Sequence, residues 1–232
     1  PSGAMSGEDG MKSVRKMIGA ALLASAASVA MTGAASAEGE VSGNVALTSN
    51  YVWRGVIQSD GAFAVQGGFD YGSDLFYAGV WASSVDDFGI DASTELDLYA
   101  GFTPSLGPLS FDIGVIAYFY PETTVDSDFV ELALGASYAP IEPLELGVGI
   151  YWSGDYLASG DDSVFIEGTI GYAISDAFSV SAGYGAFDQG ATLGSYDTWN
   201  IGGTASFHGF DFDLRYYDAD GLGLGEEISF TI

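Results

Sequence analysis

The chain has 232 residues, no cysteine, 32 acidic residues against five basic ones, and a formal net charge of −27. A polyanion of this strength repels phosphate, so the composition excludes nucleic acid as a partner. The lack of cysteine excludes disulfides and thiolate metal sites, and it is compatible with an exported protein whose fold needs no cross-link.

The N-terminal segment predicts an exported protein. We interpret residues 1–10 (PSGAMSGEDG) as an upstream remnant outside the fold. Residues 11–37 have the features of a signal peptide: a basic start, an Ala/Leu/Val run, and the small-x-small cleavage pattern Ala35-Ser36-Ala37. An uncleaved membrane anchor is the alternative, but the run is rich in Ala and Ser and only weakly hydrophobic for a membrane span.

The remaining residues, 38–232, predict one domain. Its only basic residues are Arg54 and Arg215, against 30 carboxylates, because Glu8 and Asp9 account for two of the 32; its net charge is therefore −28. No apolar run after residue 37 is long enough for a transmembrane helix.

From Val41 to Ile232, apolar and polar residues alternate in about a dozen segments of roughly ten residues. Alternation with a period of two places apolar side chains on one face of a strand and polar ones on the other. Residues 95–102, 111–119, 144–152 and 210–217 show it most regularly, whereas residues 75–84 carry large side chains in both parities and their faces cannot be assigned. The pattern predicts an all-β fold, a transmembrane antiparallel up-and-down β-barrel of about 12 strands.

The connections between the segments are alternately short and long, as in barrels with tight periplasmic turns and longer extracellular loops. The predicted short links are 72–74, 103–108, 139–143, 175–176 and 208–209, and the predicted long links are 53–61, 85–93, 121–128, 153–163, 187–197 and 218–225.

Aromatic residues near the strand ends favour a lipid-facing surface over the alternative, a soluble sandwich or lipocalin-like barrel. These residues share the parity of the apolar face: Trp152, Tyr172, Tyr184, Trp199, Phe207, Phe210 and Tyr216. The last strand, residues 227–232, alternates to its end but finishes on Ile232 instead of an aromatic residue.

Four segments resemble the TorF porin family, and the resemblance extends over essentially the whole of residues 38–232. They are SNYVWRG (49–55), AVQGGF (64–69), FYAGVWA (76–82) and ELDLYAG (95–101). The resemblance implies an outer-membrane barrel with a channel role, and it implies no catalytic residues and no particular substrate.

The polar positions of the alternating segments include the residues that we predict to line the pore: Glu95, Asp97, Asp112, Glu131, Glu145, Glu167, Asp211, Asp213 and Arg215. Carboxylates around a water-filled lumen attract cations. The alternative is that these groups bond across the interior and plug the barrel. Asp211 and Asp213 are also expected to pair with Arg215, and Arg54 is expected to extend to lipid headgroups, with an inward constriction charge as its alternative.

Two further motifs resemble a catalytic pair and a calcium-binding loop. We interpret His208 as a turn residue beside Gly209, because neighbours at a hairpin point to opposite faces and a Ser206/His208 catalytic pair would need spatial convergence. The run 218–223 (DADGLG) begins like a calcium loop but lacks the ligands expected at its fifth and twelfth positions, which leaves only weak divalent binding by acidic loops.

The sequence thus predicts a non-enzymatic channel without a cofactor in the bacterial outer membrane, passing small cations or small neutral solutes. Lipid and lipopolysaccharide are its expected surroundings. The alternative function is a non-conducting surface barrel that acts through its acidic loops.

Overall fold

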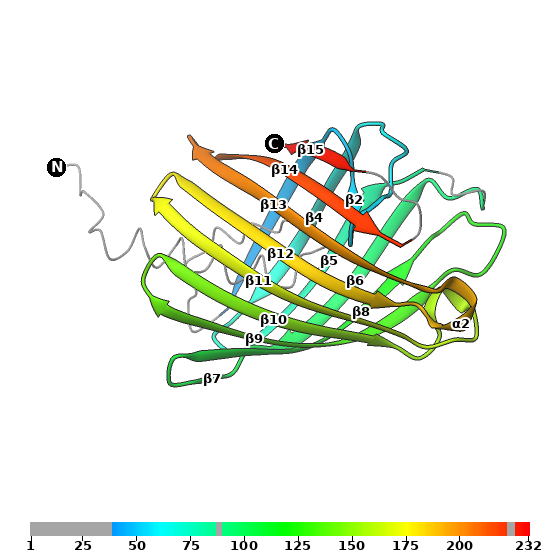
Figure 1. The fold of residues 1–232 in the computed structure, drawn as a ribbon, viewed down its shortest axis with the longest axis horizontal. Helices are drawn as coiled ribbons and strands as arrows, with labels where there is room; N and C mark the ends of the chain where they lie inside the picture. The colour runs from blue at the N-terminus through cyan, green and yellow to red at the C-terminus, as the bar shows by residue number, and fades with distance from the viewer. Residues whose placement is uncertain (1–38, 87–89, 222–225) are drawn as a thin grey trace.

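The computed structural model describes residues 39–86, 90–221 and 226–232, which form a barrel of tilted strands (Figure 1). The predicted signal peptide and remnant lie outside these residues. Within them, twelve long strands run antiparallel to their neighbours. The long strands are β1 (Glu40–Thr48), β4 (Ala64–Gly72), β5 (Phe76–Ser84), β6 (Thr94–Phe102), β8 (Leu109–Phe119), β9 (Phe129–Ile141), β10 (Leu144–Ser153), β11 (Ser163–Ser175), β12 (Phe178–Asp188), β13 (Ser195–Phe207), β14 (Phe210–Asp220) and β15 (Glu227–Thr231).

Shorter elements lie in the connections. The first long loop contains a two-stranded ribbon of β2 (Val52–Trp53) and β3 (Val56–Ile57), and β7 (Ser105–Leu106) extends the turn after β6. A 3₁₀ turn, η1 (Tyr156–Ala158), and a single helical turn, α2 (Gly190–Leu193), lie in two other long loops. Among the described residues, no helix is long and apolar enough to cross a bilayer.

The sheet closes on itself, which confirms the predicted fold class and strand number. Each long strand pairs with the next along the chain, and β1 returns to pair with β15. Backbone hydrogen bonds at this seam join Leu47 N to Ile232 O (2.9 Å), Ile232 N to Leu47 O (3.0 Å) and Ser49 N to Phe230 O (2.8 Å). Closure joins the first and last long strands, as a sheet in hydrocarbon requires.

Several predicted links are shorter in the structure because strand pairing continues into them; β14, for example, runs to Asp220, which pairs with Asp197. β9 extends to Ile141, which pairs with Leu144 across the turn. β12 and β13 remain paired to Asp188 and Ser195, so the loop after β12 begins later than predicted. The order of short and long connections is otherwise the predicted one.

The outer surface is apolar. Leu134, Val148 and Ile166 lie on neighbouring strands and are 52%, 49% and 49% exposed, as expected for residues that face lipid chains. The predicted outward aromatic residues are confirmed on this face: Trp152, Tyr172, Tyr184, Trp199, Phe207 and Phe210 are exposed, and Tyr216 contacts Trp199.

β5, whose faces the sequence left open, turns Trp81 and Ser83 inward, where both are buried. Gly79 follows on the same face, and the next inward residue after it, Tyr77, donates a hydrogen bond to Asp112 (2.9 Å). The alternation is hidden in the sequence because β5 faces lipid on one side and large aromatic neighbours on the other.

A charge on the lipid face tests the position of the bilayer. Leu134 lies between Ile113 and Ile150 in register. We expect Leu134→Arg to lower the free energy of unfolding from phospholipid vesicles by about 2–4 kcal/mol, because the charge enters hydrocarbon. Glu142→Arg, in the turn after β9, should change it by less than about 1 kcal/mol in the same denaturant titration. Equal effects would contradict a membrane-spanning barrel.

Candidate functional site: the lumen and the hairpin inside it

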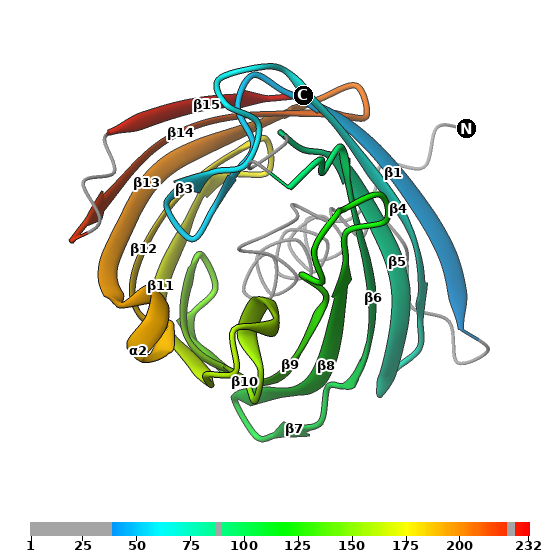
Figure 2. The ribbon, with the colours of Figure 1, turned by 90° about the vertical axis from the view of Figure 1, so that its right-hand side faces the viewer.

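The first long loop folds back into the barrel. Figure 2 looks along the barrel from the end that carries α2 and shows the β2–β3 segment inside the ring of strands. We call residues 52–57 the inner hairpin. Its tip is Arg54-Gly55, with φ angles of 48° and 83°. A side chain at Gly55 would collide with Thr198 on β13 and Ala219 on β14, so glycine lets the tip press against that wall.

Arg54 forms the central contact of the lumen. Its Nη1 and Nη2 donate to Oε1 and Oε2 of Glu131 at 2.7 and 2.8 Å, and both side chains are buried. Four aromatic rings surround the guanidinium, with its Cζ atom at 4.2–5.0 Å from their centroids. These rings belong to Trp53, Tyr151, Phe165 and Phe187.

The prediction that Arg54 extends to headgroups is therefore wrong. The turn at Arg54-Gly55 reverses the chain into the lumen, where a paired carboxylate and aromatic faces compensate the lost hydration of the guanidinium. A bidentate carboxylate partner could not be recognised in the sequence, because Arg54 and Glu131 are 77 residues apart.

The inner hairpin lies in a layer of buried side chains. At this level, every one of the twelve long strands contributes an inward residue that is at most 5% exposed. These residues are Thr48, Ala64, Trp81, Glu95, Tyr118, Glu131, Tyr151, Phe165, Phe187, Tyr196, Ala219 and Ser229. Ring contacts continue through the layer, for example between Trp53 and Phe187 (5.8 Å) and between Tyr51 and Trp81 (5.6 Å).

Phenols in the loops donate to carboxylates of this layer. Tyr51 donates to Glu95 Oε1 at 3.1 Å. Burial raises the pKa of the Tyr51, Tyr120 and Tyr156 hydroxyls above the usual value for tyrosine, so all three stay protonated at neutral pH.

The structure places the residues predicted to line the pore as follows. Six are buried on the inward face: Glu95, Asp97, Asp112, Glu131, Glu145 and Glu167. The other three, Asp211, Asp213 and Arg215, are half-buried on β14. Whether these side chains line an open pore stays a prediction.

Sequence reasoning missed Asp70, which is 5% exposed on β4 and accepts a hydrogen bond from the Tyr99 hydroxyl. Tyr99 reaches it by lying across Gly79 on the intervening strand, where any side chain would overlap the ring. Tyr77 crosses Gly101 and Gly114 in the same way to reach Asp112. The signal that could have revealed these contacts is tyrosine in the polar parity beside inward glycines of neighbouring strands.

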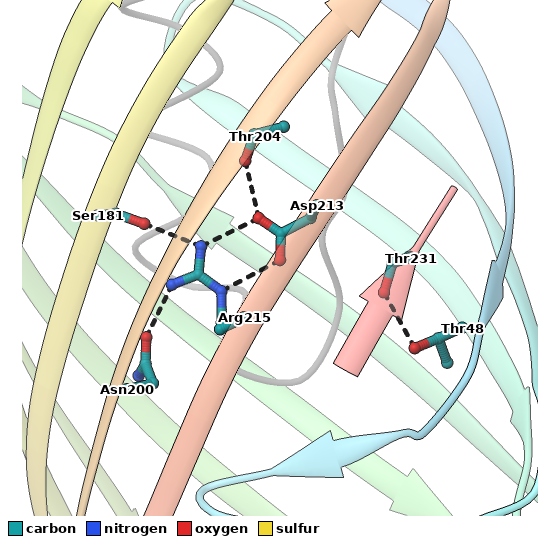
Figure 3. A network of polar contacts seen from close by, with 7 residues as sticks. All are labelled: Thr48, Ser181, Asn200, Thr204, Asp213, Arg215 and Thr231. Atoms are coloured by element: carbon teal, nitrogen blue, oxygen red, sulfur yellow. Dashed lines mark hydrogen bonds and ion pairs between the residues drawn. The ribbon is translucent and has the colours of Figure 1, made fainter. Parts of the chain in front are cut away.

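Arg215 lies in a second polar network on the wall of β12, β13 and β14 (Figure 3). It donates to Asp213 Oδ2 (3.1 Å), Asn200 Oδ1 (2.8 Å) and Ser181 Oγ (2.9 Å). Thr204 donates to the same Asp213 carboxylate at 2.8 Å. The expected pairing with Asp213 is present.

Asp211 has a different partner, because it accepts a hydrogen bond from Ser206 Oγ at 2.5 Å. His208 forms a tight turn with Gly209, with φ angles of 52° and 85°, which confirms it as a turn residue. The calcium-like run continues into Leu222 and Gly223, which lie outside the described residues. Among the described residues, no group of three His, Cys, Asp or Glu side chains is arranged to hold a metal ion.

Comparisons with known proteins agree with this architecture. The model of a bacterial protein family of unknown function, Gcw_chp, matches residues 32–225. No curated protein matches the chain in sequence. TorF is not named by the matching family, so the resemblance to that family stays a prediction.

Two solved structures share the fold. A NanC porin structure is 10% identical with a TM-score of 0.57, and the match covers 81% of this chain and 97% of that one. A KdgM porin is 6% identical with a TM-score of 0.58, and the match covers 83% and 95%. At these identities the likeness shows the barrel fold alone.

The ion pair inside the lumen can be tested by a double-mutant cycle. We expect Glu131→Gln to lower the free energy of unfolding by about 3–5 kcal/mol, because it leaves the Arg54 guanidinium buried without its counter-ion. Asp213→Asn should cost about 1 kcal/mol, since the Asp213 and Arg215 side chains are 20% and 16% exposed and water compensates part of the loss. The double variant Arg54→Met/Glu131→Gln should lose less free energy of unfolding than the sum of the losses of the single variants Arg54→Met and Glu131→Gln. Additive costs would contradict the pairing.

Proposed function

We propose that this chain, which belongs to the Gcw_chp family of bacterial proteins of unknown function, is a porin-like channel of the bacterial outer membrane. It passes small solutes by passive diffusion and prefers cations to anions. The apolar exterior and the barrel fold shared with two porins support the location.

The observation that carries the cation preference is the charge of the lumen. Of its two arginines, Arg54 is paired with Glu131 and Arg215 with Asp213. Inward carboxylates outside these two pairs include Asp70, Glu95, Asp97, Asp112, Glu167 and Asp211. An excess of fixed negative charge raises the local concentration of cations and lowers that of anions.

The barrel is surrounded by outer-membrane lipid and lipopolysaccharide. Outer-membrane lipid contacts the apolar strands, and lipopolysaccharide meets the acidic loops at the end that carries α2. Divalent cations bind weakly between these loops and the lipopolysaccharide phosphates. The solutes are small cations or small neutral molecules, and the channel needs no cofactor and catalyses no reaction.

A second candidate function is a non-conducting surface barrel. The buried layer around Arg54 favours it, because side chains from all twelve long strands are buried there. In this version the inner hairpin stays in place, and the acidic loops act through divalent bridges to lipopolysaccharide.

Conductance separates the two functions. In planar bilayers with a tenfold KCl gradient, we expect the purified barrel to show single-channel currents. The sign of their reversal potential should indicate that K⁺ permeates more readily than Cl⁻. A reversal potential of the opposite sign would refute the cation preference. The absence of current, together with loss of lipopolysaccharide binding in a divalent chelator, would favour the surface barrel.

The inner hairpin should limit the current. We expect replacement of residues 52–57 by a Gly-Ser linker of equal length to raise single-channel conductance at least about threefold, because the hairpin occupies the cross-section of the lumen. An equal replacement of residues 190–193, which form α2, is the matched control and should leave conductance unchanged. Unchanged conductance in the first variant would show that the hairpin is not the constriction.

A further inference from the structure

The last strand stops pairing before it reaches the tight turns. β15 has only five residues, and its register with β1 includes Thr48 but none of residues 40–46 (Figure 1). The backbone bonds nearest its end join Leu47 and Ile232 in both directions, at 2.9 and 3.0 Å. Among the described residues, no strand is in register with residues 40–46 on the side opposite β4. We call this part of β1 the open edge.

The open edge presents the backbone groups of alternate residues. The N–H and C=O groups of successive residues in a strand point to opposite sides, and those of Leu47 point to β15. The groups of Val41, Gly43 and Val45 therefore point the same way, past the end of β15. Those of the residues between them point to β4, with which β1 is paired over its full length.

The strand on the other side of β15 has an unpaired end as well. β14 is paired with β15 from Asp213 onward, whereas its first three residues, Phe210–Phe212, have no partner on that side among the described residues. β1 and β14 thus lose their common neighbour at the same point. A strand that continued the line of β15 would form hydrogen bonds on both of its sides.

The open edge lies beside the lipid face. Val41 and Val45 are 71% and 78% exposed on that face. Hydrocarbon cannot bond an N–H or C=O group, so unpaired backbone there is costly. Another extended backbone is the partner that satisfies a whole row of such groups at once.

The open edge lacks the features that keep strands from pairing. Natural proteins protect exposed edges with charges, prolines or bulges. Residues 41–46 (VSGNVA) contain no charged residue and no proline, in a chain with a net charge of −27. Their register with β4 runs without a shift, so no bulge twists the edge away. The open edge is therefore regular, uncharged and able to accept a strand.

We propose that the open edge binds an extended peptide segment of a partner protein, which enters from the side of the tight turns and completes the wall between β1 and β14. The inference goes beyond the proposed channel function and does not depend on it. Parity defines the chemistry of the segment. Thr231 faces the lumen, where it bonds Thr48, and Ile232 faces lipid, so the positions that follow in this line alternate between polar and apolar.

Charge defines one position of the segment more closely. Asp211 is the lumen-facing residue in the unpaired end of β14, and it accepts a hydrogen bond from Ser206. The lumen-facing residues of the open edge, Ser42, Asn44 and Ala46, are neutral. A basic residue of the segment beside Asp211 would form a cross-strand ion pair. The expected partner is thus an alternating polar and apolar strand with one lysine or arginine on its polar face.

Amide exchange of the purified barrel in detergent, followed by NMR, tests whether the edge is open. Without a partner, the amides of Val41, Gly43 and Val45 should exchange at least about tenfold faster than those of Ser42 and Asn44, which bond β4. Equal exchange at all five positions would overturn the proposal, because the edge would then be either covered or not formed.

A synthetic peptide tests binding. The probe has seven residues of alternating threonine and valine, with one threonine replaced by lysine. We expect it to slow amide exchange at Val41, Gly43 and Val45 at least about tenfold and to leave Ser42 and Asn44 unchanged. The same peptide with proline at its centre is the control and should give no protection, because proline lacks the N–H donor. The proposal is overturned if neither peptide protects the edge or if both protect it equally.

Variants of the barrel locate the peptide. Val45→Pro removes one backbone donor of the open edge but no bond to β4, so it should weaken peptide binding about tenfold, whereas Val45→Thr should bind as the wild type does. Should Val45→Pro not fold, Asp211→Asn is the second variant, and it should weaken binding of the lysine peptide but not of a peptide without lysine. Wild-type affinity in both Val45→Pro and Asp211→Asn would place the peptide elsewhere and overturn the proposal. Binding is measured without current, so failure of the channel function would appear separately.

Discussion

Closure of the sheet at the seam between β1 and β15 is the constraint on which the rest of the molecule depends. β15 has only five residues, yet its backbone bonds to Leu47 and Ser49 complete the ring. Side chains reinforce the seam, since Thr48 bonds Ser229 at 2.8 Å. Thr48 also accepts a hydrogen bond from Thr231 at 2.9 Å (Figure 3). In hydrocarbon, an open edge would leave a row of unpaired N–H and C=O groups, so every other strand relies on this join.

A closed ring has an interior that must be filled or hydrated, and the chain fills the loop end with its own first loop. The inner hairpin brings a cation, Arg54, to a fully buried carboxylate, Glu131. Aromatic side chains on the wall then replace water around the pair. Inward glycines make room for this packing, as where the Phe165 ring covers Gly185.

The charges of the lumen are divided between two walls. Acidic residues with tyrosine partners occupy β4, β6 and β8, whereas Arg215 and its polar partners occupy β12, β13 and β14. Because Arg54 and Arg215 are both paired with carboxylates, the interior keeps a net negative charge. The proposed selectivity follows from the net charge.

The sequence by itself determined the strands, the faces of all but β5, and the outward aromatic residues, because a period of two is a local property that most segments display alone. It also identified most inward carboxylates, since parity assigns Glu95, Asp97 and Glu131 to the polar face. Only the tertiary structure decided what those carboxylates contact. Arg54 meets Glu131, and Tyr99 crosses Gly79 to Asp70, through contacts between segments that are adjacent only after the ring has closed. Parity states which way a side chain points, but closure and the inward fold of a loop determine what lies opposite.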